Sequence, residues 1–376
     1  MSTNTLISPT MVARDAAITL SNRLIVANHV SRDKEVIFGN KVGDSIKVTV
    51  PTAVSDADEF SGTTSASDVT EQEIDLTLEK HFYKRIDLTS KQKSLELTDF
   101  TRMVTIPAVS GLQDSIDKFL LRNMQVFRKN LTGTVTNRPS SMAHIAKATQ
   151  VLNDAKLIKS GRVALIDSTA EYTFVQLGQF TSQDYGADST RNLREGTLGR
   201  RYGFDFVTDT NLGAFSRSAA AGDITGTVLT NGTPAIGAVE VPIDGITSTT
   251  GTIYAGTVIT LSGDTTRYVV RKDATIADNA TTLTVAPALV AAPGDGAAVA
   301  FEAAGYSNLV YHQAAVAAAI VAPRPLNVNS AVQSFGGVSL RVSMDSSITS
   351  LSDSIVYDVF CGCRVIEPDG GALFCG

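Results

Sequence analysis

Two alternating segments near the start of the chain, joined by a polar stretch, constrain its fold most strongly. Residues 45–50 and 74–79 each alternate apolar and polar side chains, which is the pattern of a half-buried β-strand. The stretch between them is acidic and rich in Ser, Thr and Gly, so the pair predicts a long hairpin, or ribbon, over residues 45–89. An isolated two-stranded ribbon is marginally stable in water. We therefore expect this ribbon to lie on a neighbouring molecule, as in a subunit of an assembly.

A helical arm is predicted ahead of the ribbon, over residues 8–29. Ser8 suits the N-cap, and Pro9 suits the first helical position because its missing N–H is not needed there. One face repeats every four residues and would be buried: Val12, Ala16, Leu20 and Leu24. Such an arm also needs a surface to cover it.

Composition indicates a globular protein and argues against several functions. The chain has 376 residues, a hydrophobic content of 43% and a mean hydropathy of +0.08, which allow two or three domains. No apolar run reaches the roughly 20 residues of a membrane span, and no secretory signal is expected. The net charge of −6, without a basic stripe, disfavours a protein that grips nucleic acid through its phosphates. Three cysteines form no disulfide framework and favour a reducing compartment.

The longest helical pattern covers residues 107–129. A second helix is predicted over 142–157 and a short strand over 162–167, so that 99–167 is expected to be an α+β unit. The apolar positions of the long helix recur every three or four residues and form its predicted core: Leu112, Ile116, Phe119, Leu120 and Phe127.

A change of composition near residue 219 predicts a separate β-rich module. From 219 to 303 the chain is rich in Thr, Gly, Ala and Val, and its short alternating runs are separated by turn signals. A helical pattern returns at 311–321, so the module is expected to be an insertion. Two further strands are predicted over 338–343 and 355–360.

The sequence offers no set of catalytic residues or metal ligands. Phosphate-binding and dinucleotide-binding glycine motifs are absent, and Gly305-Tyr-Ser-Asn-Leu309 lacks the closing glycine of a nucleophile elbow. Cys361 and Cys363 could present two thiolates on one face of a strand, but small buried core residues are the favoured interpretation. Four histidines share no spacing of a metal pair: His29, His81, His144 and His312. We therefore predict no enzyme activity, no cofactor and no metal.

Two charged clusters have alternative interpretations. The acidic residues Asp56, Asp58 and Glu59, with Asp68, lack the spacing of a calcium loop and predict a solvated hairpin tip. The alternative is an electrostatic contact with a basic patch on another subunit. The nearest patch lies on a predicted loop without a series of stacking aromatic residues: Arg191, Arg194, Arg200 and Arg201.

Several segments, taken in order, resemble the major capsid (coat) proteins of tailed bacteriophages. The opening of the chain is similar to theirs over residues 5–13, 22–26 and 43–51. Further segments that resemble this family are 253–263, 308–312, 323–326 and 358–362, so the likeness spans nearly the whole chain. The most similar branch is that of the podovirus coat proteins with an inserted β domain. One departure is Gly256-Thr257, where members of the family have Gly-Asp.

The resemblance implies an α+β Hong Kong-97-type capsid fold with an inserted all-β domain. The regions it implies are an N-terminal helical arm (1–34), an extended β-hairpin loop (35–97), a peripheral domain with a spine helix (98–167), an axial domain in two parts (168–218 and 304–345), the inserted β-rich domain (219–303) and C-terminal strands that return to the peripheral domain (346–376).

The resemblance also implies a function and partners. Many copies would form hexamers and pentamers of an icosahedral shell around double-stranded DNA, assembled in the host cytoplasm with a scaffolding protein and a portal protein, with room for a decoration protein. The expected inter-subunit contacts are residues of the ribbon and its tip: Ile46, Val48, Val50, Asp56, Asp58, Glu59, Phe60, Ile74, Leu76 and Leu78. The alternatives are a nanocompartment shell or a tail component, and a hydrolase with a carbohydrate-binding insert.

Overall fold

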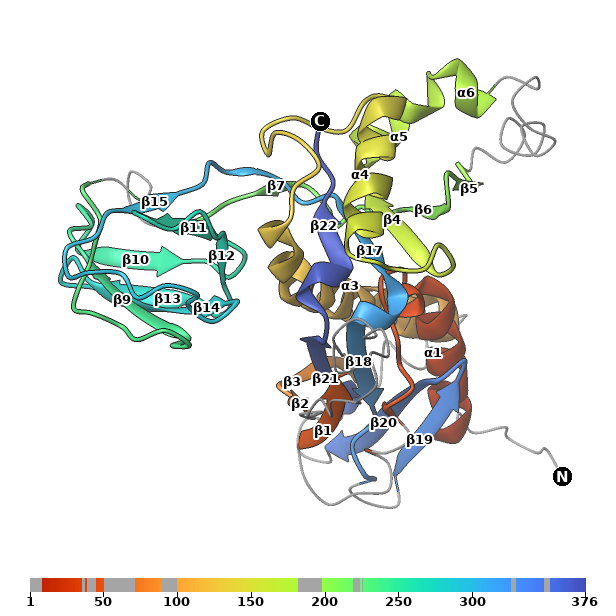
Figure 1. Cartoon of the computed structure of the whole chain (residues 1–376). Coiled ribbons are helices and arrows are strands. Elements are labelled where there is room, and N and C mark those ends of the chain that lie inside the picture. The colour runs from red at the N-terminus through yellow and green to blue at the C-terminus, as the bar shows by residue number, and fades with distance from the viewer. Residues whose placement is uncertain are drawn as a thin grey trace, which may run out of the picture. The chain divides into compact units, whose positions relative to one another are not determined.

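The computed structural model describes residues 9–35, 38, 45–50, 72–89, 100–181, 198–218, 224, 226–325, 329–347 and 352–376. The chain divides into two compact units (Figure 1). The first comprises residues 1–22, 32–112 and 317–367, and the second comprises 23–31, 113–316 and 368–376. The chain therefore passes between the units several times.

The first unit is built on an antiparallel sheet. Its strands follow the order β18 (Val316–Val321), β21 (Ser352–Val365), β20 (Val338–Ser347) and β19 (Ser330–Phe335), and β3 (Lys80–Thr89) also pairs with β21. The strands predicted over 338–343 and 355–360 are confirmed as parts of β20 and β21.

The N-terminal helix of the first unit is shorter than predicted. Helix α1 (Pro9–Arg23) buries the expected face with Val12, Ala16 and Leu20, but the chain then turns into a short 3-10 helix, η1 (Ala27–His29). The side-chain amide of Asn28 donates to the Leu24 carbonyl oxygen at 2.6 Å. Side chains such as Asn compete with the helical backbone for these bonds, which favours ending a helix here.

The ribbon is also shorter than predicted. Strand β1 (Ser45–Val50) pairs with β2 (Gln72–Thr77) in the register Ile46↔Leu76 and Val48↔Ile74. The outgoing segment breaks after Thr77, and β3 then joins the main sheet, so the ribbon does not continue to residue 89 as predicted. The backbone of Thr77 passes so close to Gly362 of β21 that a Cβ there would collide with the Thr77 carbonyl oxygen. This crossing is possible because residue 362 has no side chain.

The long helix begins in the first unit and continues into the second, which also contains a mixed sheet. Helix α3 (Ile106–Met124) follows a π-helical turn, η3 (Thr101–Thr105), and continues into the 3-10 helix η4 (Gln125–Lys129). The sheet has the order β22 (Gly371–Leu373), β17 (Leu309–His312), β4 (Arg162–Ile166), β6 (Phe204–Thr208) and β5 (Arg200–Arg201). Helices α4 (Met142–Asp154), α5 (Ser168–Val175) and α6 (Gly178–Thr181) complete this part. The helices and the strand predicted over 107–129, 142–157 and 162–167 are confirmed.

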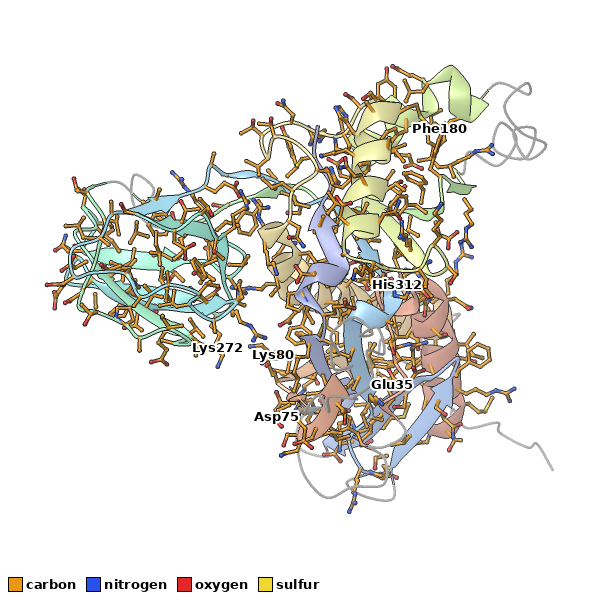
Figure 2. The ribbon with its side chains drawn as sticks, in the orientation of Figure 1. Glu35, Asp75, Lys80, Phe180, Lys272 and His312 are labelled. Atoms are coloured by element: carbon orange, nitrogen blue, oxygen red, sulfur yellow. The ribbon has the colours of Figure 1, made fainter. Side chains whose placement is uncertain are left out.

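Aromatic rings fill the core beside this sheet. Phe174 of α5 lies 5.7 Å from Phe180 of α6 (Figure 2) and 5.9 Å from Phe374, measured between ring centroids. Apolar residues of α4, including Ile145 and Leu152, pack into the same cluster. Helix α5 begins at a satisfied cap, because the Asp167 side chain accepts the backbone N–H of Ala170 at 2.9 Å.

The helix predicted over 311–321 is wrong. This segment forms β17, a single 3-10 turn, η6 (Gln313–Ala315), and β18. Strand β17 lies between β22 and β4, and residues 316–320 of β18 are all buried, so their sequence shows no alternation of apolar and polar side chains. A short apolar run of this kind has no period that separates a buried strand from a helix.

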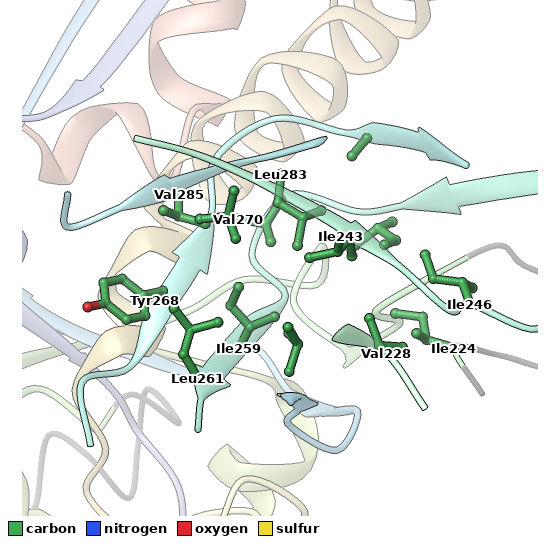
Figure 3. Close-up of a cluster of buried hydrophobic side chains, with 14 of the residues drawn as sticks. Ile224, Val228, Ile243, Ile246, Ile259, Leu261, Tyr268, Val270, Leu283 and Val285 are labelled. Carbon is green, nitrogen blue, oxygen red and sulfur yellow. The ribbon is translucent and has the colours of Figure 1, made fainter. Parts of the chain in front are cut away.

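Residues 228–301 form a β module with its own core (Figure 3). A six-stranded sheet has the order β15 (Val299–Phe301), β11 (Val258–Leu261), β12 (Tyr268–Val270), β14 (Thr281–Ala286), β9 (Glu240–Asp244) and β8 (Leu229–Thr230), and β10 (Thr250–Ile253) pairs with β13 (Ala274–Ala277). Ile243, Ile259, Tyr268 and Leu283 are fully buried in its core. The β-rich character predicted from the alternating runs is confirmed.

Candidate assembly surface and the neck of the β module

The apolar face of the ribbon is covered by its own chain. Ile46, Val48 and Leu76 are at most 4% exposed, and they pack in one cluster with Phe38 and two small residues of β18, Ala317 and Ala319. A neighbouring molecule is therefore not needed to bury these three side chains. Their cluster anchors the base of the ribbon in the first unit.

The outer face of the ribbon is polar and exposed. Lys47 Nζ lies 2.5 Å from Glu73 Oε2, and both side chains are substantially exposed. A hydrogen bond to Glu73 raises the pKa of the Lys47 ammonium. An exposed pair of this kind contributes little stability, so this face is open to contacts with another molecule.

The other predicted contact residues differ in their burial and in whether the structure describes them. Ile74 and Leu78 are half-buried. Val50 lies in β1, paired with Gln72. The tip residues lie outside the described part of the chain: Asp56, Asp58, Glu59 and Phe60. Contact of the ribbon with a neighbouring subunit stays a prediction.

The side chains of the predicted core of the long helix are buried. The five residues are at most 8% exposed: Leu112, Ile116, Phe119, Leu120 and Phe127. Phe127 stacks on Tyr311 of β17 with 6.0 Å between ring centroids. The end of the helix is thus packed against the sheet of the second unit.

The first unit contains a buried ion pair that the sequence did not predict. Arg341 on β20 donates two hydrogen bonds to Asp358 on β21, and Asp358 Oδ2 also lies 2.9 Å from His81 Nε2 on β3. The Arg341 side chain is 9% exposed and that of Asp358 2%. The cluster joins three strands. Alternating strands do carry polar residues, but nothing in the sequence indicates that these two face inward.

The chain enters and leaves the β module through a paired neck, residues 214–218 and 301–306. Strand β7 (Ala214–Phe215) pairs with β16 (Gly305–Tyr306), so that Phe215 lies opposite Gly305. Arg128 of η4 is 1% exposed, lies 4.2 Å from the centre of the Phe215 ring and donates to the Tyr306 carbonyl oxygen at 3.2 Å. Burial lowers the pKa of the Arg128 guanidinium to about 10.

A second arginine ties the module to η4. Arg267 Nη1 and Nη2 each donate to a different oxygen of Glu302 at 2.6 Å, and the same guanidinium donates to the carbonyl oxygens of Arg128 and Lys129. Two parallel hydrogen bonds between a guanidinium and a carboxylate fix the relative orientation of the two groups and also stabilise the pair. These hydrogen bonds therefore fix the orientation of the neck relative to η4.

Substitution of Glu302 by Gln should weaken the contact between the neck and η4. Loss of one charge-assisted bond and of the charge opposite Arg267 and Arg128 should destabilise the neck by about 1–3 kcal/mol. We expect faster hydrogen exchange at residues 128–129 and 301–306, with the core of the module unchanged. Glu240→Gln, an exposed position on β9, is the matched control. Equal exchange in both variants would contradict a role for the pair.

The surroundings of the cysteines and histidines agree with a structural role for these side chains. Cys361 and Cys363 lie in β21 and are buried, and burial raises the pKa of the Cys363 thiol to about 12, so a thiolate is disfavoured. No group of three metal-ligating side chains occurs among the described residues. Each histidine makes a separate hydrogen bond, as His312 does with the Ala314 N–H at 3.2 Å (Figure 2).

The predicted basic patch is only partly described. Arg200 on β5 lies 3.7 Å from Asp205 in an exposed pair, and Arg201 follows it in the same strand. Arg191 and Arg194 lie outside the described residues. No described helix is long and apolar enough to cross a membrane.

A half-buried carboxyl marks the turn that follows the arm. Glu35 (Figure 2) accepts the backbone N–H of Ile320 at 3.1 Å. Burial raises the pKa of the Glu35 carboxyl to about 7, although Arg32 and the Ile320 bond oppose this. Since the pKa in the folded state exceeds the ordinary value of 4.5, folding binds a proton, and stability falls as pH rises from about 4.5 to 7.

Glu35→Gln should therefore stabilise the protein above neutral pH. The amide oxygen can still accept from Ile320, while the cost of burying a charge is removed, so we expect a gain of about 1–2 kcal/mol at pH 8 and little change near pH 4.5. Urea unfolding at both pH values measures this difference. Asp33→Asn, at an exposed position two residues away, should show no such pH dependence. A gain of equal size at both pH values would rule out the proton linkage.

Comparison with solved structures shows the fold. A chain from a structure of Mycobacterium phage Che8 is 16% identical, with 93% of this chain and 90% of that chain covered and a TM-score of 0.52. Chains from the capsid of the cyanophage P-SCSP1u (13% identity, 88% and 83% covered, TM-score 0.46) and from the capsid of Ralstonia phage GP4 (7%, 90% and 82%, 0.48) are also similar. No family model and no curated protein sequence matches. The resemblance to tailed-phage coat proteins is confirmed at the level of the fold.

Proposed function

We propose that the chain is the major capsid protein of a tailed phage. The observation that carries this proposal is the fold shared with the Che8 chain over nearly the full length of both. A second, independent support is the set of sequence segments that resemble phage coat proteins and follow one another in the same order. In this function the chain assembles as hexamers and pentamers into an icosahedral shell around double-stranded DNA, with a scaffolding protein and a portal protein as partners.

The proposal assigns the described elements to the regions of a coat protein. Under this proposal α1 belongs to the arm (1–34), the β1–β2 ribbon to the extended loop (35–97) and α3 is the spine helix of the peripheral domain (98–167). The β module is the inserted domain (219–303), the segments around it (168–218 and 304–345) are the axial domain, and residues 346–376 return to the peripheral domain. A shell uses many repeated contacts, each of which can be weak alone.

The chemistry of the described residues agrees with a structural role. Buried polar groups such as Arg341 and Asp358 bond to each other and join neighbouring strands. The net charge of −6 suits a container that does not bind its DNA tightly. We infer that the protein acts through its contacts rather than through catalysis.

Expression of the chain alone and together with its phage's scaffolding protein tests the proposal. Negative-stain microscopy should show closed shells of uniform size with the scaffold, and irregular assemblies or free subunits without it. Small oligomers under both conditions would overturn the proposal. Long tubes in place of shells would favour a tail component.

A further inference from the structure

The chain contains a single Asn-Gly pair, Asn231-Gly232, directly after β8 of the β module. Asn231 is exposed, and Gly232 has a φ of +93°, a backbone conformation that favours glycine. A Cβ built at Gly232 would meet no atom within 4 Å, so the space around this residue is open. Nothing on Gly232 therefore shields its backbone nitrogen from the Asn231 side chain.

An exposed asparagine followed by glycine can lose its side-chain amide without an enzyme, and asparagine is among the thermally labile residues. The backbone N–H of Gly232 first gives its proton to a base in the solvent, and its nitrogen then attacks Cγ of Asn231. A new C–N bond forms, the bond from Cγ to the side-chain nitrogen breaks, and that nitrogen takes a proton from water and leaves as ammonia. Water then opens the cyclic imide to give aspartate or isoaspartate. The balance is one water consumed, one ammonia released and one negative charge gained.

In the folded chain the attacking nitrogen is held by Asp295. The Gly232 N–H donates to Asp295 Oδ1 at 2.7 Å, and hydrogen bonds to an ionised acceptor are the strong ones. This bond directs the N–H toward the carboxylate. It also disfavours loss of the proton, because the nitrogen anion would then lie beside another negative charge. Both effects slow the attack on Asn231.

The position of Asp295 is fixed by Thr230, the last residue of β8, which is 1% exposed. The Thr230 N–H donates to the Ala297 carbonyl oxygen, and the Thr230 carbonyl oxygen accepts the Gly296 N–H, both at 2.9 Å. The Thr230 hydroxyl donates to the Gly294 carbonyl oxygen at 2.7 Å and accepts the Ala297 N–H at 2.9 Å. These bonds hold the loop that carries Asp295 beside β8.

We propose that Asn231 is a deamidation site of the β module and that Asp295 sets its rate by holding the Gly232 N–H. The reaction is slow while this bond is formed and becomes fast when the loop that carries Asp295 moves away. Each event places a second negative charge near the Asp295 carboxylate, and like charges at short distance repel. The product therefore marks subunits in which this part of the β module has opened.

Peptide mapping by mass spectrometry of the full chain, kept folded at mildly alkaline pH, measures the rate. Conversion at Asn231 should be at least about tenfold slower than in the same chain unfolded in guanidinium chloride. Asp295→Ala should accelerate conversion in the folded chain at least about tenfold, and Glu240→Gln, the matched control at an exposed position of β9, should leave it unchanged. The proposal is overturned if the folded chain reacts as fast as the unfolded one, or if Asp295→Ala reacts as slowly as the unmodified chain.

Hydrogen exchange separates the role of Asp295 from a general opening of its loop. The Gly296 and Ala297 amides report on the loop, because they donate to Thr230. In Asp295→Ala these two amides should stay protected while conversion at Asn231 accelerates. If they lose protection by the same factor as the reaction gains speed, opening of the loop explains the acceleration and the proposal fails.

Discussion

A chain that lacks residues 52–69 is expected to fold as a subunit and to fail to form shells. The deletion leaves Pro51, Thr70 and Glu71 between Val50 and Gln72, which lie opposite each other in the β1–β2 register. Three residues are a suitable length for a hairpin loop, and Ile46, Val48 and Leu76 still hold the base of the ribbon. The variant therefore removes the tip without removing the core beneath it.

Assembly should be reduced at least about tenfold, because each subunit loses one contact that is repeated throughout the shell. Shell yield by sedimentation and negative-stain microscopy measures the effect, and circular dichroism confirms the fold. A chain in which Asp56, Asp58 and Glu59 are replaced by their amides is the matched control for charge. Shells of normal yield from the deletion variant would show that the tip only decorates the surface.

Asp358→Ala is expected to have the largest effect on stability among single substitutions in the first unit. It leaves the Arg341 guanidinium buried without its carboxylate, at a cost of about 3–5 kcal/mol. It also removes the bond to His81, so that β3 loses one of its side-chain contacts with β21. Urea unfolding and hydrogen exchange in β3 and β20 measure the loss.

The double variant Arg341→Met/Asp358→Leu distinguishes a buried charge from a loss of packing. Replacement of both partners by apolar residues of similar size should restore most of the stability lost in Asp358→Ala. If the double variant is as unstable as the single one, geometry specific to the ion pair holds the three strands together.

Local patterns in the sequence predicted the elements that face one uniform environment. Leu112, Ile116 and Leu120 repeat with the helical period because one side of α3 is buried along its length. The run around Leu283 alternates because this strand of the β module points Leu283 and Val285 into the core. In both cases the buried side chains recur along the sequence with the period of the helix or the strand.

The errors occurred where tertiary contacts override the local pattern. Val316 to Ile320 form a strand because β21 lies beside them and both faces are buried, which no local period records. The break after Thr77 depends on Gly362, far away in the chain. Burial of Ile46 depends on Ala317 and Ala319, which looked like helix formers. The Arg341–Asp358 pair likewise joins two strands whose pairing has to be known first.

The neck has a consequence for how this β module could be gained or lost. Because Phe215 and Gly305 lie opposite each other, the ends of the module are as close as those of a hairpin. A short turn could replace residues 219–300 without moving the strands on either side, and a foreign domain with adjacent termini could occupy the same place. The neck thus provides a natural position for grafting cargo onto every subunit of an assembly.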